Sequence, residues 1–96
     1  MTRVRIPPVL RTHVGGDKEV EAAGSNVGEV LRDLISRHPQ MGEQLLTSEG
    51  VLHRFVNVYV NGQDVRYTEL LETPVTERDT VIILPAMAGG APVGGR

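Results

Sequence analysis

Hydrophobic and polar side chains alternate near the start of the chain, which predicts an N-terminal β-hairpin. Val4 and Ile6 fall on one face of a strand and Arg3 and Arg5 on the other, the period of two expected of a half-buried strand. The two prolines that follow limit this strand or confine it to a sheet edge. A Gly-Gly-Asp turn and a second, approximately alternating stretch at residues 18–22 complete the hairpin.

A period of 3.6 replaces this alternation in the next segment and predicts the main helix. Asn26 is followed three residues later by Glu29, as in the capping box that begins a helix. Pro39 ends the helix, because the residue before a proline is pushed out of the helical region. Between these signals, apolar residues recur three and four positions apart and form one stripe: Val27, Val30, Leu31, Leu34 and Ile35.

The second half of the chain returns to strand patterns. Residues 55–60 alternate, and Asn61 with Gly62 is the favoured pair for a tight primed turn, so residues 63–67 should turn back. The segments that flank these elements should complete the core with five apolar side chains: Met41, Leu45, Leu70, Leu71 and Val75.

The last strand pattern is the continuous apolar run Val81–Leu84, which is typical of a strand buried on both faces. Pro85 has no N–H to donate to a sheet and should end the pairing. Beyond it, residues 86–96 contain few sizeable apolar side chains, and ordering a backbone costs roughly 1–2 kcal/mol per residue. We therefore expect a flexible C-terminal tail.

The order of these elements is strand, strand, helix, strand, short strand and strand, and this order predicts the fold class. It is an α+β, β-grasp (ubiquitin-like) domain formed by residues 1–85, with a mixed sheet and one main helix packed on one face. In this topology the first and last strands lie parallel at the centre of the sheet, which suits the apolar run of the last strand.

Composition excludes several classes of function. A net charge of −2 without a long run of one sign provides no electrostatic surface for nucleic acid or anionic membrane. The chain has no cysteine, which removes thiol catalysis and cysteine-based zinc sites, and its histidines are not spaced as metal ligands. No apolar segment predicts a signal peptide or a membrane span. We expect a cytoplasmic protein without catalytic residues and without a bound metal or cofactor.

A set of polar and aromatic residues on the predicted sheet offers a docking surface for a protein partner. Exposed aromatic side chains beside arginine are typical of protein contacts. A merely solvated sheet face is the alternative that the sequence leaves open. The set comprises Arg5, Phe55, Asn57, Tyr59 and Arg66.

The tail contains Gly89-Gly90, which permits two interpretations. Glycine lacks Cβ, so an extended Gly-Gly can pass through a narrow channel, and residues 85–90 could reach roughly 20 Å from the folded body. The segment could then bring the Gly90 carboxyl into a partner's active site. A flexible end without a function is the alternative.

Two stretches of the chain resemble, in register, the CysO-like sulfur carriers of the ThiS/MoaD ubiquitin-like family. They are residues 83–90, Ile-Leu-Pro-Ala-Met-Ala-Gly-Gly, and residues 52–61, Leu-His-Arg-Phe-Val-Asn-Val-Tyr-Val-Asn. The resemblance implies a carrier arm at residues 86–90, with Ala88, Gly89 and Gly90 at its end.

In such carriers a ThiF/MoeB-like adenylating enzyme uses ATP to activate the terminal glycine carboxyl, here that of Gly90. The resemblance further implies that the activated carboxyl becomes a thiocarboxylate and gives its sulfur to a sulfur-accepting synthase. In CysO-like systems that synthase is a pyridoxal-phosphate cysteine synthase. The carrier itself is a co-substrate and not an enzyme.

Residues 91–96 depart from this pattern, because Gly90 is joined to Ala91 by a peptide bond and has no free carboxylate. The encoded form should therefore be inert. Some members of the resembled family have residues beyond the diglycine, which a JAMM-type zinc metalloprotease removes, and the same cut between Gly90 and Ala91 is expected here. A rival terminus exists, since loss of Arg96 alone would expose Gly94-Gly95.

Three other functions stay open on the sequence. A ubiquitin-like modifier would be conjugated to lysines through the same Gly90. A MoaD-like small subunit would remain bound within a molybdopterin synthase. A plain interaction module would have no use for Gly90.

Overall fold

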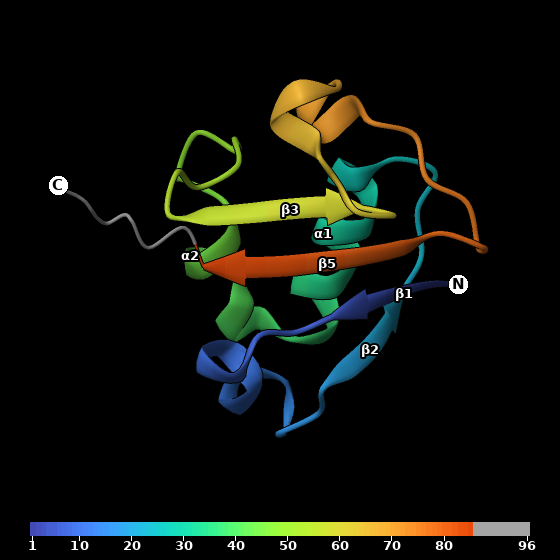
Figure 1. Cartoon of the computed structure of the whole chain (residues 1–96). Helices are drawn as coiled ribbons and strands as arrows, with labels where there is room; N and C mark the ends of the chain where they lie inside the picture. The colour runs from blue at the N-terminus through green and yellow to red at the C-terminus, as the bar shows by residue number, and fades with distance from the viewer. Residues whose placement is uncertain (86–96) are drawn as a thin grey trace, which may run out of the picture.

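A five-stranded mixed sheet with one long helix across one face forms the body of the molecule (Figure 1). The computed structural model describes residues 1–85. The strands are β1 (Thr2–Arg5), β2 (Glu19–Ala22), β3 (Val56–Val60), β4 (Gln63–Asp64) and β5 (Thr80–Pro85), in the spatial order β2-β1-β5-β3-β4. The predicted α+β, β-grasp fold is confirmed.

The strand pairing agrees with the predicted topology. β1 pairs antiparallel with β2, with Val4 opposite Val20, and parallel with β5, with Val4 opposite Val81. β5 also pairs antiparallel with β3, with Val58 opposite Ile83. The first and last strands are thus parallel neighbours, and β5 is the central strand of the sheet.

The main helix α1 (Val27–Arg37) begins at the predicted cap. The Asn26 side-chain oxygen accepts a hydrogen bond from the backbone N–H of Glu29 at 2.8 Å. The Glu29 carboxylate turns back and accepts from both the N–H and the hydroxyl of Ser25, each at 2.9 Å. These two bonds lower the pKa of Glu29, and the ionised carboxylate lies in the first turn, where the helix dipole favours negative charge.

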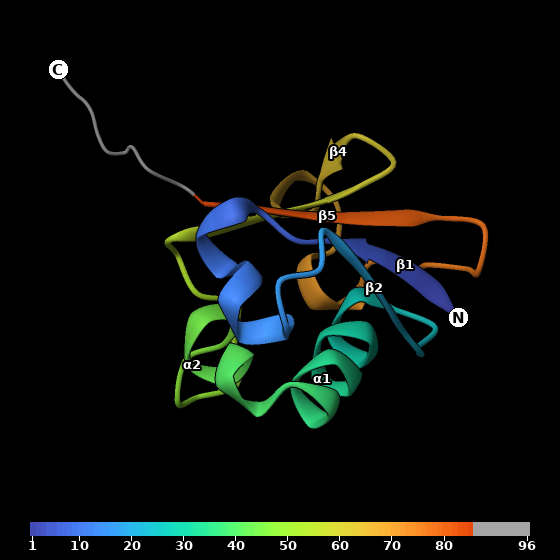
Figure 2. The same ribbon diagram turned by 90° about the horizontal axis from the view of Figure 1, so that it is seen from below.

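The core lies between α1 and the inner face of the sheet. The apolar stripe of α1 is fully buried from Val27 to Leu34, and Ile35 is half-buried against the same cluster. A short helix, α2 (Gly42–Leu45), closes one end of the core with Leu45, preceded by the buried Met41. Figure 2 shows α1 and α2 on one side of the sheet, and no α-helix of residues 1–85 lies on the other side.

Two connections differ from the expected pattern. The segment after β1 forms a 3-10 helix, η1 (Pro8–Val14), which buries Leu10 and Val14 and lies in the connection between the hairpin strands. Pro8 lies in its first turn, where a missing N–H costs nothing, so the prolines end β1 and also start a helix. The return strand β4 has only two residues and continues as two 3-10 turns, η3 (Val65–Tyr67) and η4 (Leu70–Glu72).

Two predictions about buried side chains were wrong. Leu70 was expected in the core but is 49% exposed, and its backbone has a φ of +53°. Leu84 was expected to be buried on β5 but is 43% exposed, because the helices cover only one face of the sheet. Leu71 and Val75 pack against or within the core as expected.

The tight turn between β3 and β4 has the predicted geometry. Asn61 has a φ of +51° and Gly62 a φ of +87°, the left-handed backbone that a type I′ turn requires at both central positions. The expected tail, with its arm at residues 86–90 and its extension at residues 91–96, lies outside the described residues. Within residues 1–85, no helix is long and apolar enough to cross a membrane.

Candidate functional site

β5 leads directly into the C-terminal segment and is held on both sides. Its pairing with β3 runs from Val81, opposite Val60, to Pro85, opposite Val56, while β1 holds its first half. Val81 and Ile83 are fully buried. The sheet therefore fixes the position of Pro85, from which the rest of the chain departs.

The residues assigned to the carrier arm and cleavage site, Ala88, Gly89, Gly90 and Ala91, lie outside the described residues, so their roles stay predictions. Five residues beyond Pro85 can span at most about 18 Å. A partner that receives Gly90 must therefore approach the folded body closely around the end of β5.

The face of the sheet opposite α1 carries the predicted docking residues, and we call it the outer face. In β3, Asn57 and Tyr59 alternate with the buried Val56 and Val58 and point away from the helix. Arg5 lies in the same cross-strand row as Tyr59, because both are opposite Ile82. The strands thus bring residues that are distant in sequence onto one surface.

Arg66 joins this surface from outside the strands. One of its guanidinium nitrogens donates to the Asn57 side-chain oxygen at 2.8 Å, and another donates to the backbone oxygen of His53 at 3.1 Å. Arg66 lies in η3. The Asp64 side chain caps the first turn of η3 by accepting a hydrogen bond from the Arg66 backbone N–H. The two bonds fix the Asn57 amide and attach the segment before β3 to η3.

Phe55 lies just before β3 and is 58% exposed. The Arg54 guanidinium lies 5.1 Å from the centre of its ring, and the His53 ring centre also lies 5.1 Å from it. Such contacts pre-order the aromatic side chain in the free protein. All five predicted docking residues therefore share or border the outer face.

Sequence reasoning missed the apolar centre of this face. Ile82 and Leu84 of β5 lie between Arg5 on one side and Tyr59 and Asn57 on the other. The continuous apolar run of this strand had suggested burial on both faces. Polar and apolar residues alternate clearly in β1 and β3, the two strands next to β5. This alternation was the signal that one face of β5 would also be exposed.

A groove of about 340 Å³ begins where β5 ends. Pro85 forms part of its wall, so the C-terminal segment starts at the groove itself. Val9, on η1, is 66% exposed beside it. The groove is lined by Val9, Leu10, Glu43, Gln44, His53, Phe55, Val56 and Pro85.

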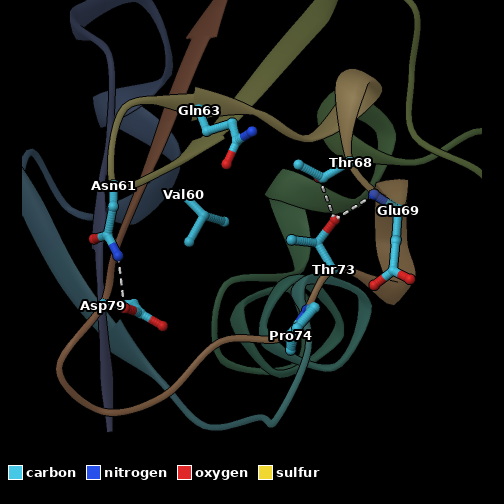
Figure 3. A pocket seen from close by; sticks show the side chains of 8 residues that line it. All are labelled: Val60, Asn61, Gln63, Thr68, Glu69, Thr73, Pro74 and Asp79. Atoms are coloured by element: carbon cyan, nitrogen blue, oxygen red, sulfur yellow. Dashed lines mark hydrogen bonds between the residues drawn. The ribbon is translucent and has the colours of Figure 1, made fainter.

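A larger hollow, of about 430 Å³, lies at the opposite end of β5 (Figure 3). Four of its polar side chains, those of Asn61, Thr68, Thr73 and Asp79, hold turns together. Asp79 accepts from the Asn61 amide at 2.6 Å and from the Thr76 N–H at 2.8 Å, and these bonds lower its pKa. Thr73 shares a hydrogen bond with Thr68 at 2.8 Å. This hollow is structural and far from the end of β5.

Within residues 1–85, no three His, Asp or Glu side chains lie close enough together to hold a metal ion. Asp33, whose pKa is lowered by the Ala23 N–H and by Arg37, ties β2 to α1. What the described residues provide is an anchored C-terminal strand within a sheet whose outer face carries the predicted docking residues.

Comparison with known proteins gives consistent results. The sequence profile of the ThiS family matches residues 4–90. The sulfur carrier protein CysO of Mycobacterium tuberculosis H37Rv is 48% identical over 89 residues, which cover 91% of this chain and 96% of the relative. A putative sulfur carrier protein of Archaeoglobus fulgidus is 36% identical and covers 92% of this chain and 97% of its own.

Solved structures agree with these matches. CysO in the Amycolatopsis orientalis BexX/CysO complex superposes with a TM-score of 0.85 at 51% identity, covering 94% of this chain and 100% of that one. M. tuberculosis CysO gives 0.84 at 45% identity, covering 91% and 100%. Small archaeal modifier protein 1 of Methanosarcina acetivorans gives 0.83 at 27% identity, covering 93% and 95%.

Proposed function

The chain belongs to the ThiS family and is a CysO-like sulfur-carrier protein, and we propose that it carries sulfur on the carboxyl of Gly90. It is a carrier and not an enzyme. The observation that carries this proposal is the anchoring of β5, whose pairing with Val56 ends at Pro85, five residues before Gly90. A rigid strand followed by a short diglycine arm suits delivery of a chain end to another protein's active site.

The proposed chemistry begins with activation of the carboxylate. A Gly90 carboxylate oxygen attacks the α-phosphate of ATP and releases pyrophosphate, which gives an acyl-adenylate. A sulfur nucleophile then attacks the acyl carbon and displaces AMP, leaving a thiocarboxylate whose sulfur can be given to an acceptor. The adenylating partner, of the ThiF/MoeB type, supplies ATP and its binding site, since a carboxylate is a poor electrophile until it is activated.

Removal of residues 91–96 precedes this step in the proposal. The amide between Gly90 and Ala91 has no carboxylate to adenylate, so the precursor is inert. A JAMM-type zinc metalloprotease is the class of enzyme proposed for the cut. The rival terminus at Gly95 would lengthen the arm by five residues. It would also place the carboxyl beyond residue 90, where the match to the family ends.

The proposed docking surface for these partners is the outer face. Its Leu84 and the exposed Phe55 lie close to the end of β5, where a partner that takes up a five-residue arm must make contact. A similar CysO has been crystallised in complex with BexX, which supports a function through protein partners. A pyridoxal-phosphate cysteine synthase is the proposed acceptor enzyme, and the product is cysteine or another sulfur metabolite.

Intact mass spectrometry tests the proposal directly. The chain ending at Gly90 and the full chain are each incubated with the adenylating enzyme, ATP and a sulfide source. We expect only the shorter chain to gain the mass difference of sulfur replacing oxygen, and Gly90→Val in the shorter chain to prevent it. Modification of the full chain, or of the Gly90→Val variant, would contradict the proposal.

A ubiquitin-like modifier is the second candidate, because a small archaeal modifier protein 3 of Haloferax volcanii is 32% identical over 66 residues, covering 69% of this chain and 71% of its own. The same activated Gly90 would then form isopeptide bonds to lysines. Peptide mapping of cell extracts separates the two functions, since only a modifier leaves residues 79–90 attached to lysine after digestion with trypsin, which cuts after Arg78. A MoaD-like subunit of a molybdopterin synthase would instead co-purify as a stable complex.

A further inference from the structure

A second apolar surface lies at the β4 edge of the sheet. The loop before β3 and the η4 turn lie on the same side of β3 (Figure 1) and form a groove of about 320 Å³. Val51 and Leu70 are its most exposed apolar side chains, at 52% and 49%. The groove is lined by Val51, Leu52, Arg66, Glu69, Leu70, Leu71 and Glu72.

Leu70 is held at the surface in an unfavourable backbone conformation. Its φ of +53° lies in the left-handed region, which is costly for a leucine and free for a glycine. The buried Thr73 fixes the turn: its hydroxyl accepts from the Glu69 N–H at 3.1 Å, and its N–H donates to the Leu70 oxygen at 3.1 Å. Folding alone gives no reason to place an exposed leucine here.

The rim of the groove is anionic. Glu69 and Glu72 are both exposed. Among residues 1–85, the only cation in the lining of this groove is Arg66, which directs its N–H groups to Asn57 and His53. A ligand with positive charge beside an apolar group complements this rim, whereas an anionic lipid surface would be repelled. Lysine and arginine flanking an aliphatic side chain provide that combination.

We propose that this groove is a docking site for a protein segment that inserts an aliphatic side chain between Val51 and Leu70 and places lysine or arginine beside Glu69 and Glu72. The site requires neither Gly90 nor its chemistry. Its test therefore succeeds or fails independently of the sulfur-carrier function.

A labelled peptide provides the test. The probe is a fluorescein-labelled hexapeptide with two central leucines and two lysines on each side, and its binding to the full chain is measured by fluorescence anisotropy. We expect about tenfold weaker binding for Leu70→Gly and for Val51→Ser, which corresponds to about 1.4 kcal/mol. The double variant Glu69→Gln, Glu72→Gln and added salt should each weaken binding several-fold.

Matched controls separate docking from folding. Val9→Ser removes an apolar side chain that is even more exposed but lies elsewhere, and it should leave binding unchanged. Leu70→Gly also relieves the positive φ, so its melting temperature should not fall. Peptides with serine for leucine, or with glutamate for lysine, should bind at least tenfold more weakly.

Three results of the peptide experiment would overturn the proposal. They are absence of binding at millimolar peptide, equal binding of the peptide by Leu70→Gly and by the unaltered chain, and equal binding of the lysine and glutamate peptides. Sedimentation experiments provide a further test. If the chain self-associates and Leu70→Gly abolishes this self-association, the proposal is also overturned, because a second copy of the chain would then occupy the groove.

Discussion

Pro85 lies opposite Val56, the first residue of β3, and has no N–H to donate to the ladder between the two strands. On the other side β1 ends earlier, with Arg5 opposite Ile82. The position from which the proposed arm starts is therefore defined by the sheet. Arm length, counted from Pro85, becomes the variable that determines how far Gly90 can reach.

Shortening the arm should abolish function without affecting the fold. In the chain that ends at Gly90, deletion of residues 86 and 87 shortens the maximal reach by about 7 Å. We expect thiocarboxylate formation to fall about 100-fold or more, since a misplacement of even 1 Å can cost that factor. The melting temperature, measured by circular dichroism, should not change, and retention of full activity would show that the arm does not work by reach.

Substitution of neighbouring residues on β5 should separate docking from stability. Leu84 is 43% exposed on the outer face and Ile83 is fully buried beneath it. Leu84→Ala should raise the KM of the adenylating enzyme for the carrier by about 5- to 30-fold, as expected for a contact worth 1–2 kcal/mol, with little change in melting temperature. Steady-state adenylation kinetics at varied carrier concentration provide the measurement.

Ile83→Ala is the matched variant on the other face of the same strand. It should cost about 2–5 kcal/mol of unfolding free energy and lower the melting temperature by about 10 °C or more. At a temperature where it remains folded, its KM should stay near that of the unaltered chain. A reversed pattern for the two variants would argue against docking through the outer face.

Elements with a strong local signal could be predicted from the sequence. Asn26 and Glu29 specify the start of α1 through bonds that span a few residues, and the backbone of Asn61 and Gly62 follows from their own φ preferences. The parallel pairing of β1 and β5 followed from the order of elements. These features depend on short-range chemistry or on topology, and both are visible in a single sequence.

Features that depend on what covers a surface could not be predicted as well. Leu84 has the same neighbours in sequence whether or not a helix lies over it, so the apolar run alone suggested burial. Leu70 is exposed at the start of η4 with a positive φ, and no pattern in the sequence indicates either feature. The sequence predicted which polar and aromatic residues lie on the outer face. Its apolar centre could be identified only from the register of β5 with β1 and β3.

Two glycines should respond in opposite ways to alanine. A Cβ at Gly24 would lie 2.6 Å from the Val30 nitrogen and 2.8 Å from the Glu29 Cβ, so the loop that enters α1 would have to shift. We expect Gly24→Ala to cost about 1–3 kcal/mol of unfolding free energy, measured by urea denaturation.

Gly42 is the control, since it lies in α2 with helical dihedrals and a Cβ there would meet only the Ile35 side chain at 3.4 Å. Gly42→Ala should stabilise the protein by about 0.4–1 kcal/mol, because alanine restricts the unfolded chain and favours a helix. Equal effects of the two substitutions would show that the approach of Gly24 to α1 is not tight.

Acid should weaken the contact between β2 and α1. The Asp33 carboxylate accepts from the Ala23 N–H at 2.7 Å and from the Arg37 guanidinium at 2.8 Å, which lowers its pKa. A carboxylate with a lowered pKa contributes its stabilisation above its ordinary pKa and loses it as the pH falls through the lowered value. Part of the acid sensitivity of the fold below about pH 4 should therefore come from this group.

Asp33→Asn tests this linkage. The variant should melt at a lower temperature than the unaltered chain at pH 7, because it cannot form the charged bond to Arg37. The difference should shrink as the pH falls through the lowered pKa of Asp33 and should vanish below it, where the unaltered chain has also lost the charge. Asp17→Asn, in the exposed turn before β2, is the control and should follow the unaltered chain at every pH. A difference for Asp33→Asn that stays constant from pH 7 to pH 2 would mean that its effect is steric and that the lowered pKa contributes nothing to stability.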